Sequence, residues 1–263
     1  MLEIIIPVAT LGALGLLFGV GLSIASKRFA VEIDPRLEKI HGLLPGSNCG
    51  ACGGAGCFGF AEGILSGKME VSACRVSGDK IKEEIAGLLG KKLEKKVKRI
   101  AALRCNGGSR VKERYLYQGI EECAAAHAVL GGQKACVFGC LGFGDCVRVC
   151  PFDAIALSQE GLAVVDKEKC KACNKCVLAC PKKLFSLVPV TNSVYVACSS
   201  RDIGKDTKVS CPVGCIACRL CEKACTFDAI HVIDNLAVID YQKCTSCGEC
   251  VKVCPMKTIR VRS

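Results

Sequence analysis

The chain has 263 residues, of which 24 are cysteine, none is tryptophan and only 5% are aromatic. This composition excludes an ordinary core of large side chains and indicates small domains in which bound metal supplies much of the folding energy. The formal net charge of +11 counts every cysteine as neutral, although metal-bound thiolates are negative. Because no basic stretch is interleaved with stacking aromatic residues, we expect no nucleic-acid partner.

An uncharged, largely apolar segment runs from Ile4 to Ala25. About 20 consecutive apolar residues suffice to span a bilayer, and the first positive charges, Lys27 and Arg28, follow the segment. The positive-inside rule then predicts that the bulk of the chain lies on the cytoplasmic side. The alternative, a buried core helix, has no neighbouring segment to cover it. We expect residues 1–26 to be a single-pass anchor in the cell (inner) membrane, in contact with membrane lipid.

The first cysteine group follows a short linker and has the spacing C-x2-C-x4-C-x16-C. Its members are Cys49, Cys52, Cys57 and Cys74. Four glycines lie between residues 50 and 56, where they let the backbone approach a bound cluster closely. Residues 58–66 show helical periodicity and would connect the first three ligands to the fourth. We therefore expect residues 27–90 to form a domain that holds one [4Fe-4S] cluster.

Residues 91–134 are expected to be a connecting segment. A basic, periodic stretch from residue 75 onward predicts a helix, and residues 100–103 predict a short strand. Cys105 and Cys123 stand apart from any cysteine run. Isolated cysteines are more often small buried apolar residues than metal ligands. We therefore expect no cluster in this segment.

The next cysteines form two runs within residues 135–190. The second run is a regular C-x2-C-x2-C-x3-C, the bacterial ferredoxin spacing for [4Fe-4S] clusters, whereas the first is stretched. In such pairs the fourth cysteine of each run completes the cluster of the other run. We expect one cluster on Cys136, Cys140, Cys146 and Cys180. We expect a second on Cys150, Cys170, Cys173 and Cys176.

Two regular runs follow within residues 191–263, after a linker that contains Cys198 and Cys211. By the same exchange, one cluster is expected on Cys215, Cys218, Cys221 and Cys254. The other is expected on Cys225, Cys244, Cys247 and Cys250. The sequences after Cys150 and Cys225 are alike, which indicates a duplicated module. Each copy predicts a short helix after that cysteine and then a β-hairpin.

Other uses of the cysteines fit less well. Zinc prefers two cysteine pairs or cysteines mixed with histidine, and none of the three histidines lies beside a cysteine run. A disulfide framework needs an oxidising compartment. Five clusters of about two negative charges each would also offset most of the formal positive charge. The cysteines outside the five expected sites are Cys105, Cys123, Cys198 and Cys211. We expect them to be structural thiols, with a further centre as the alternative if the fold gathers them.

The order of these motifs resembles that of the B subunits of Rnf ion-translocating electron-transport complexes. The resemblance is carried by the membrane segment, by L-P-G-S-N-C-G-A-C-G at 44–53, by G-C-L-G-F-G-D-C-V at 139–147 and by the paired ferredoxin motifs. It implies an α+β chain with a transmembrane helix, a small single-[4Fe-4S] domain and two tandem bacterial 2[4Fe-4S] ferredoxin-like domains. It also implies a subunit of a membrane-bound ferredoxin:NAD oxidoreductase that couples electron transfer to Na+ or H+ translocation.

The sequence contains no nucleophile with a base and orienting partner, no phosphate loop and no flavin or nicotinamide fingerprint. We therefore expect no substrate-converting site on this chain alone. The resemblance implies that the chain takes electrons from soluble ferredoxin and passes them to other membrane and peripheral subunits of the complex. We expect electrons to enter at the carboxyl-terminal repeat and to leave through the Cys49–Cys74 domain. The alternatives are an electron-donor subunit of another membrane oxidoreductase and a redox activator of a corrinoid protein.

Overall fold

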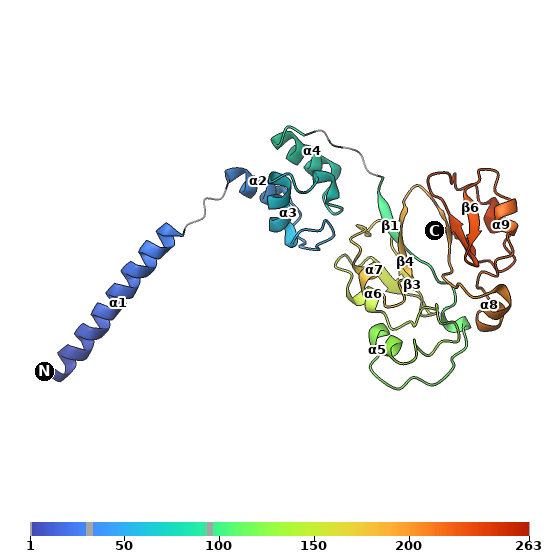
Figure 1. Cartoon of the computed structure of the whole chain (residues 1–263), viewed down its shortest axis with the longest axis horizontal. Coiled ribbons are helices and arrows are strands. Elements are labelled where there is room, and N and C mark those ends of the chain that lie inside the picture. The colour runs from blue at the N-terminus through green and yellow to red at the C-terminus, as the bar shows by residue number, and fades with distance from the viewer. Residues whose placement is uncertain (1, 30–33, 92, 94–96, 263) are drawn as a thin grey trace.

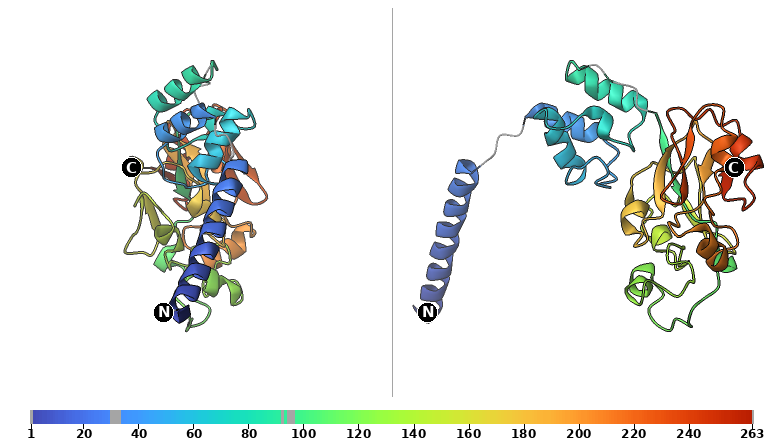
Figure 2. Two further views of the ribbon diagram at one scale, coloured as in Figure 1. Left: turned by 90° about the vertical axis from the view of Figure 1, so that its left-hand side faces the viewer. Right: turned by 45° about the vertical axis from the view of Figure 1, so that its right-hand side comes forward.

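The computed structural model describes residues 2–29, 34–91, 93 and 97–262. Four linker residues, 30–33, and part of the basic run between residues 91 and 99 lie outside the described residues. Figure 1 shows three regions in chain order, which are a long helix, a group of shorter helices and a part that contains all the described strands. The right-hand view of Figure 2 shows the long helix standing apart from the other two regions.

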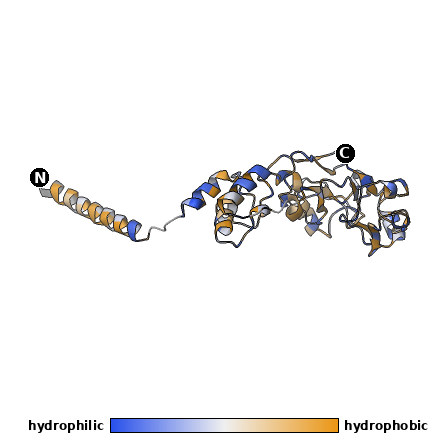
Figure 3. Ribbon diagram, turned by 90° about the horizontal axis from the view of Figure 1, so that it is seen from above, coloured by the Kyte–Doolittle hydropathy of each residue, from blue (hydrophilic) through white to orange (hydrophobic). Residues whose placement is uncertain are grey.

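Helix α1 (Leu2–Arg28) is long and apolar enough to cross a membrane. Its span Val8–Arg28 has a mean hydropathy of 2.1, and none of it is buried against the rest of the chain. In Figure 3 hydrophobic residues continue along the helix, and hydrophilic ones gather at its carboxyl end, where Lys27 and Arg28 lie. A helix that is apolar on all sides requires an apolar environment, which a bilayer provides.

The helical group contains α2 (Pro35–Leu43), α3 (Gly56–Leu65), the 3-10 turn η1 (Val71–Ala73) and α4 (Asp79–Leu88). Asp34 caps α2, because its carboxylate accepts a hydrogen bond of 2.8 Å from the backbone amide of Arg36. Ile40, Phe60, Ile64 and Ile85 from these helices are almost fully buried against one another. The helix predicted over 58–66 is confirmed as α3, which begins two residues earlier.

The remaining part contains four two-stranded antiparallel sheets among the described residues. Two are local hairpins, as predicted for both copies of the module. They pair β2 (Ile155–Leu157) with β3 (Ala163–Val165), and β6 (Ile230–Ile233) with β7 (Leu236–Ile239). The other two pair β1 (Arg99–Leu103) with β4 (Phe185–Pro189), and β5 (Val194–Val196) with β8 (Ile259–Val261). Each module therefore has one local hairpin and one sheet closed by a distant strand.

Strand β1 is a core element, although it comes from the segment expected only to connect domains. Residues 100–103 are all buried, and Leu103 lies opposite Phe185 in the pairing with β4. Ile100 packs with Ile155 and Leu184 in the core of the first module. The short strand predicted at residues 100–103 is thus confirmed, and it belongs to the same core as the cysteines of that module.

Short helices accompany the cysteine runs. They are α5 (Cys123–Ala128), α6 (Asp145–Arg148), α7 (Lys175–Ala179), α8 (Gly204–Ser210), α9 (Leu220–Lys223) and α10 (Glu249–Lys252), with the 3-10 turn η2 (Gly108–Arg110). The prediction of a helix after Cys150 and after Cys225 is wrong, because α6 and α9 precede these cysteines. Asp153 and Asp228, which follow them, have φ values of 47° and 51°. Such left-handed residues cannot continue a right-handed helix.

Candidate metal centres

Three of the expected ligand sets each line one pocket. Cys215, Cys218, Cys221 and Cys254 line a pocket of about 360 Å³. Cys225, Cys244, Cys247 and Cys250 line another of about 360 Å³. Cys150, Cys170, Cys173 and Cys176 line a third of about 320 Å³. In each pocket three thiols come from one run and the fourth comes from the partner run, which is the arrangement that suits two interlocked [4Fe-4S] clusters.

The spread of the thiols fits a cluster better than a single ion. Two thiolates on one tetrahedral zinc lie about 3.8 Å apart, since the Zn–S distance is about 2.3 Å. Among the described residues, which include all 24 cysteines, no three Cys, His, Asp or Glu side chains are close enough to share one metal ion. The thiols instead stand farther apart, around the pockets that they line.

The backbone of each regular run has left-handed residues at two fixed places, four and two residues before the third cysteine. These pairs are Ala172 and Asn174, Ala217 and Arg219, and Ser246 and Gly248. The second member of each pair is the N-cap residue, directly before the start of α7, α9 or α10. The chain thus turns tightly around the first two thiols and then starts a helical turn that carries the third.

The stretched run has the same backbone turn. Gly142 and Gly144 have φ values of 88° and 80°, and they lie four and two residues before Cys146. Gly144 is also the N-cap residue of α6, directly before its start. By this register, Cys140 occupies the place of the first cysteine of a regular run, and Phe143 occupies the place of the second. The stretched run is therefore a regular cluster turn that lacks its middle thiol.

A hydrogen bond to sulfur recurs at the fourth cysteine of every run. The backbone amide four residues later donates to the cysteine sulfur in each case. The bonds run from Ala154 to Cys150, from Leu184 to Cys180 and from Ala229 to Cys225, each of 3.4 Å, and from Thr258 to Cys254, of 3.3 Å. Donors of this kind stabilise the negative charge on a ligating thiolate and tune the reduction potential of the cluster.

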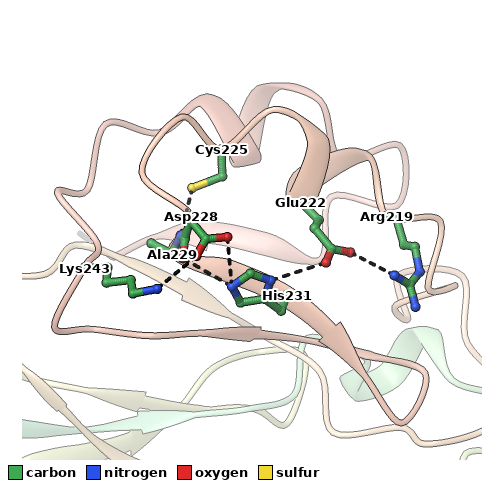
Figure 4. Close-up of polar contacts among 7 residues, drawn as sticks. All are labelled: Arg219, Glu222, Cys225, Asp228, Ala229, His231 and Lys243. Atoms are coloured by element: carbon green, nitrogen blue, oxygen red, sulfur yellow. Dashed lines mark hydrogen bonds and ion pairs between the residues drawn. The ribbon is translucent and has the colours of Figure 1, made fainter.

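An ion-pair network holds the turn after Cys225 (Figure 4). It consists of Arg219, Glu222, Asp228, His231 and Lys243. The Lys243 ammonium lies 2.9 Å from the Asp228 carboxylate, and this hydrogen bond holds the pKa of Asp228 below its usual value. His231 bridges Asp228 and Glu222, with 3.3 Å to each carboxylate. Because Asp228 immediately precedes Ala229, the network fixes the amide that donates to the Cys225 sulfur.

The cysteines of the helical group also lie close together. Burial raises the pKa of Cys52, and the neighbouring thiolates of Cys74 and Cys49 raise it further. Cys57 and Cys74 are buried in the core of this group. The hydroxyl of Ser77 donates a hydrogen bond of 3.1 Å to the Cys74 sulfur. The structure therefore brings together the four thiols expected to hold the single cluster.

The Cys57 turn depends on a glycine that has no room for a side chain. Gly56 has a φ of 79°, and a Cβ atom there would lie 2.8 Å from the side-chain oxygen of Asn48. The same oxygen accepts a hydrogen bond of 2.7 Å from the Cys57 amide. Asn48 therefore positions a cysteine that is expected to be a ligand, although it was not itself predicted as a site residue.

Cys136 lies in a different group from the one expected. It lines a pocket of about 320 Å³ together with Cys105, Cys198 and Cys211. Burial raises the pKa of Cys136 to about 12, and the nearby thiolates of Cys211, Cys105 and Cys198 also raise it. The fold thus gathers Cys136 with three of the cysteines that were expected to be structural thiols.

Cys123 lies beside the remaining members of the expected Cys136 set. Burial raises the pKa of Cys146 to about 11, and the thiolates of Cys123 and Cys180 raise it further. Burial also raises the pKa of Cys140 to about 12, with contributions from nearby Cys105, Cys123 and Cys146. Sequence spacing gave no sign of this neighbour, because Cys123 belongs to α5, well before the run.

Family models match four parts of the chain. An Fe-S cluster family matches residues 44–76, and a 4Fe-4S dicluster domain matches residues 214–259. Two families described as 4Fe-4S binding domains match residues 163–184 and 136–154. Together with the thiol groups, these matches show that the chain binds [4Fe-4S] clusters.

Several curated proteins are similar to this chain over nearly its whole length. The B subunit of the Na+-translocating ferredoxin:NAD+ oxidoreductase complex of Acetobacterium woodii is 46% identical, covering 97% of this chain and 77% of the relative. The B subunit of the ion-translocating oxidoreductase complex of Methanosarcina acetivorans is 42% identical, covering 97% of both. The B subunit of the proton-translocating ferredoxin:NAD+ oxidoreductase complex of Clostridium ljungdahlii is 39% identical, covering 99% and 93%. The chain therefore belongs to the family of B subunits of ion-translocating (Rnf) oxidoreductase complexes.

Proposed function

We propose that this chain carries electrons from soluble ferredoxin to the other subunits of an ion-translocating ferredoxin:NAD+ oxidoreductase. Helix α1 anchors it in the lipid of the cell membrane, with the bulk of the chain on the cytoplasmic side. Residues 27–90, 135–190 and 191–263 form the cluster-binding domains, and β1 ties the intervening segment to the first ferredoxin-like domain. Five [4Fe-4S] clusters, the number expected from the cysteine runs, supply one-electron carriers held at fixed positions.

The observation that carries this function is the close succession of thiol groups along the molecule. The pKa of Cys173 is raised by burial and, to a smaller extent, by the thiolate of Cys49 from the helical group. The pKa of Cys176 is raised to about 12, chiefly by burial, with Cys146 among the contributing thiolates. Thiols of neighbouring sites therefore lie close enough to influence each other's pKa, and electron transfer between fixed centres requires short separations.

The exposure of the cysteines supports the proposed direction of the path. Of the 24 cysteines, all of which the structure describes, only Cys218 and Cys247 are exposed. Both belong to the carboxyl-terminal module, one in each of its expected clusters. A soluble donor approaches an exposed centre most closely, so this module is the proposed docking end for ferredoxin. The helical group follows the membrane helix in the chain and is the proposed exit.

The experiment uses the full chain within its complex, in membrane vesicles supplied with reduced ferredoxin. We expect ferredoxin to drive uptake of Na+ or H+ and to reduce the clusters, and EPR measures this reduction. Replacing Cys52 and Cys57 by alanine should stop ion uptake and NAD+ reduction while ferredoxin still reduces the remaining clusters. If the remaining clusters also stay oxidised, electrons enter through the helical group and the proposed path is reversed. Unimpaired ion uptake in the variant would remove the helical group from the path.

The alternative role as a redox activator of a corrinoid protein is not favoured. The amino-terminal cluster domain alone would permit it, but the similarity to components of ion-translocating complexes extends over 97% to 99% of the chain. Copurification of the chain with the other members of the complex is the result expected from membranes solubilised in mild detergent.

A further inference from the structure

The pocket lined by Cys105, Cys136, Cys198 and Cys211 is built from four separate segments of the chain. Cys105 follows the end of β1, Cys198 follows the end of β5, and Cys211 directly follows the end of α8. Cys136 occupies a turn closed by the hydrogen bond from the amide of Gly139 to its carbonyl oxygen. Each thiol is therefore held by a defined element, although no two of the four belong to one sequence run.

The pocket matches the expected cluster pockets in size. Its empty space, part of which is open to solvent, is about 320 Å³, as is that of the pocket lined by Cys150 and its partners. The sulfur atoms of Cys211 and Cys105 lie 3.6 Å and 3.8 Å from the place where a Cβ atom on Gly107 would stand. The two sulfurs therefore lie near the same point beside Gly107, where the nearest atom is Cγ2 of Val111, at 2.5 Å. Gly139 and Gly214 also line this pocket, so the backbone approaches its interior closely.

The thiols of this pocket accept backbone hydrogen bonds like those of the expected ligands. The Cys198 sulfur accepts from the amides of Ser200 and Cys215, both at 3.4 Å. The Cys105 sulfur accepts from the amide of Cys140, also at 3.4 Å. A structural thiol needs no such donors, whereas a ligating thiolate is stabilised by them. The Arg110 guanidinium adds positive charge near Cys211.

Cys123 can be the fourth ligand beside Cys140, Cys146 and Cys180, because Cys136 lies in another group of thiols. The Asp145 carboxylate accepts hydrogen bonds from the amides of Cys123, at 2.9 Å, and Ala124, at 3.1 Å. Since Asp145 opens α6, these bonds fix the start of α5 beside the turn around Cys146. The amide of Phe143 lies near the Cys123 thiol and partly offsets the rise in its pKa that burial causes. That amide belongs to the position where a regular run carries its second cysteine, so Cys123 supplies the thiol that the stretched run lacks.

We propose that Cys105, Cys136, Cys198 and Cys211 hold a sixth [4Fe-4S] cluster, and that Cys123 replaces Cys136 as the partner of Cys140, Cys146 and Cys180. All 24 cysteines then fall into six sets of four. The assignment of the ligands stands on the pocket and its hydrogen bonds alone. The role of the sixth site in the relay rests on the proposed electron-transfer function.

The sixth site lies between the two ferredoxin-like modules. On one side the Cys105 sulfur is joined to Cys140 of the first module, and on the other the Cys198 sulfur is joined to Cys215 of the second. Each connection is a single hydrogen bond between a ligand of one site and the backbone of a ligand of the next. The rate of electron transfer falls steeply with distance, so a centre at this place shortens the step between the modules. It accepts one electron from one neighbour and gives one to the other.

The test compares variants of the full chain, purified without oxygen in detergent, by iron and sulfide content and by native mass spectrometry. The unaltered chain should contain about 24 irons, four at each of six sites. Cys123→Ala and Cys136→Ala should each remove one cluster, and the double variant should remove two. The five-site assignment instead gives about 20 irons and predicts that the double variant loses only one cluster. Ser199→Ala is the matched control and should retain all six, because the Ser199 hydroxyl donates to the carbonyl oxygen of Arg104 rather than to a thiol.

Native mass spectrometry of the unaltered chain counts clusters without any substitution, so the test does not depend on the folding of a variant. A count of five, or a double variant that loses only one cluster, overturns the proposal. A count of five in vesicles that still pump ions would reject the sixth site and leave the proposed function intact. A count of six in vesicles that do not accept electrons from ferredoxin would support the sixth site and reject the proposed function.

Discussion

The backbone amide of Cys215 donates a hydrogen bond of 3.4 Å to the sulfur of Cys198. Cys215 is the first cysteine of a regular ferredoxin run, whereas Cys198 lies in the linker before it. The bond therefore connects a thiol that sequence spacing leaves unassigned to a site that spacing identifies. Cys198 therefore lies at the edge of the expected cluster pocket that Cys215 lines.

A cysteine introduced at Phe143 should replace Cys123. Phe143 lies where the regular runs carry their second cysteine, between the left-handed residues Gly142 and Gly144. We expect Cys123→Ala to lose one cluster, about four irons, and the double variant Cys123→Ala, Phe143→Cys to regain it. Iron content and the EPR spectrum of the reduced protein measure this. Phe143→Ala in the Cys123→Ala background is the control and should not restore the cluster. Failure of the cysteine to restore it would show that Cys123 is not a ligand at this turn.

Removal of the Ser77 hydroxyl should lower the reduction potential of the cluster in the helical group. The hydroxyl donates to the Cys74 sulfur at 3.1 Å and so stabilises the more negative, reduced state. The hydrogen bond contributes about 1 kcal/mol, which corresponds to a fall on the order of 40 mV for Ser77→Ala in an EPR-monitored redox titration. Ser72→Ala is the matched control, because the Ser72 hydroxyl bonds Glu70 rather than a thiol. An unchanged potential in Ser77→Ala would exclude Cys74 as a ligand of that cluster.

Alanine at Gly56 should destabilise the helical group. The position has a φ of 79°, and its Cβ would lie 2.8 Å from the oxygen of Asn48 that holds the Cys57 amide. A strained left-handed residue costs about 1–3 kcal/mol, so we expect a lower unfolding midpoint and partial loss of one cluster. Gly87→Ala is the control in the same group, since a Cβ there meets nothing within 4 Å. That change should be neutral or stabilising by about 0.5–1 kcal/mol. Equal effects of the two substitutions would contradict the steric argument.

Removal of iron should unfold the ferredoxin-like modules while helix α1 persists. Cysteines make up much of the buried core of the modules. In the second module, Cys198, Cys215 and Cys221 pack with Ile230 and Leu236. Without metal these thiols repel when ionised and leave pockets unfilled, so cooperative unfolding should disappear. Far-UV circular dichroism before and after chelation measures the loss, and reconstitution with iron and sulfide should reverse it. A metal-free chain that retains a sharp thermal transition would show that the side chains alone suffice.

The spacing of the cysteines predicted those parts of the site that residues close together in the sequence form. A run such as Cys215, Cys218 and Cys221 determines its own turn, because the left-handed residues between the thiols follow from the spacing. The helix α3, the strand β1 and both hairpins were likewise readable from periodicity. The group around Cys136 was not, since its thiols come from four segments that only tertiary packing brings together. One sequence signal was available. Gly142 and Gly144 occupy the two positions that are left-handed in the regular runs, so Phe143, between them, stands where the missing second cysteine would be.

The pairing of β1 with β4 and of β5 with β8 has a consequence for separating the modules. A fragment that begins at residue 135 lacks β1 and leaves one edge of β4 without its partner. Exposed strand edges promote pairing with other chains, so such a fragment is prone to aggregate. A fragment that begins at residue 97 keeps β1 and Cys105 with the modules they complete. The first ferredoxin-like module is therefore a folding unit that starts at β1, whereas a break between β4 and β5 separates no paired strands.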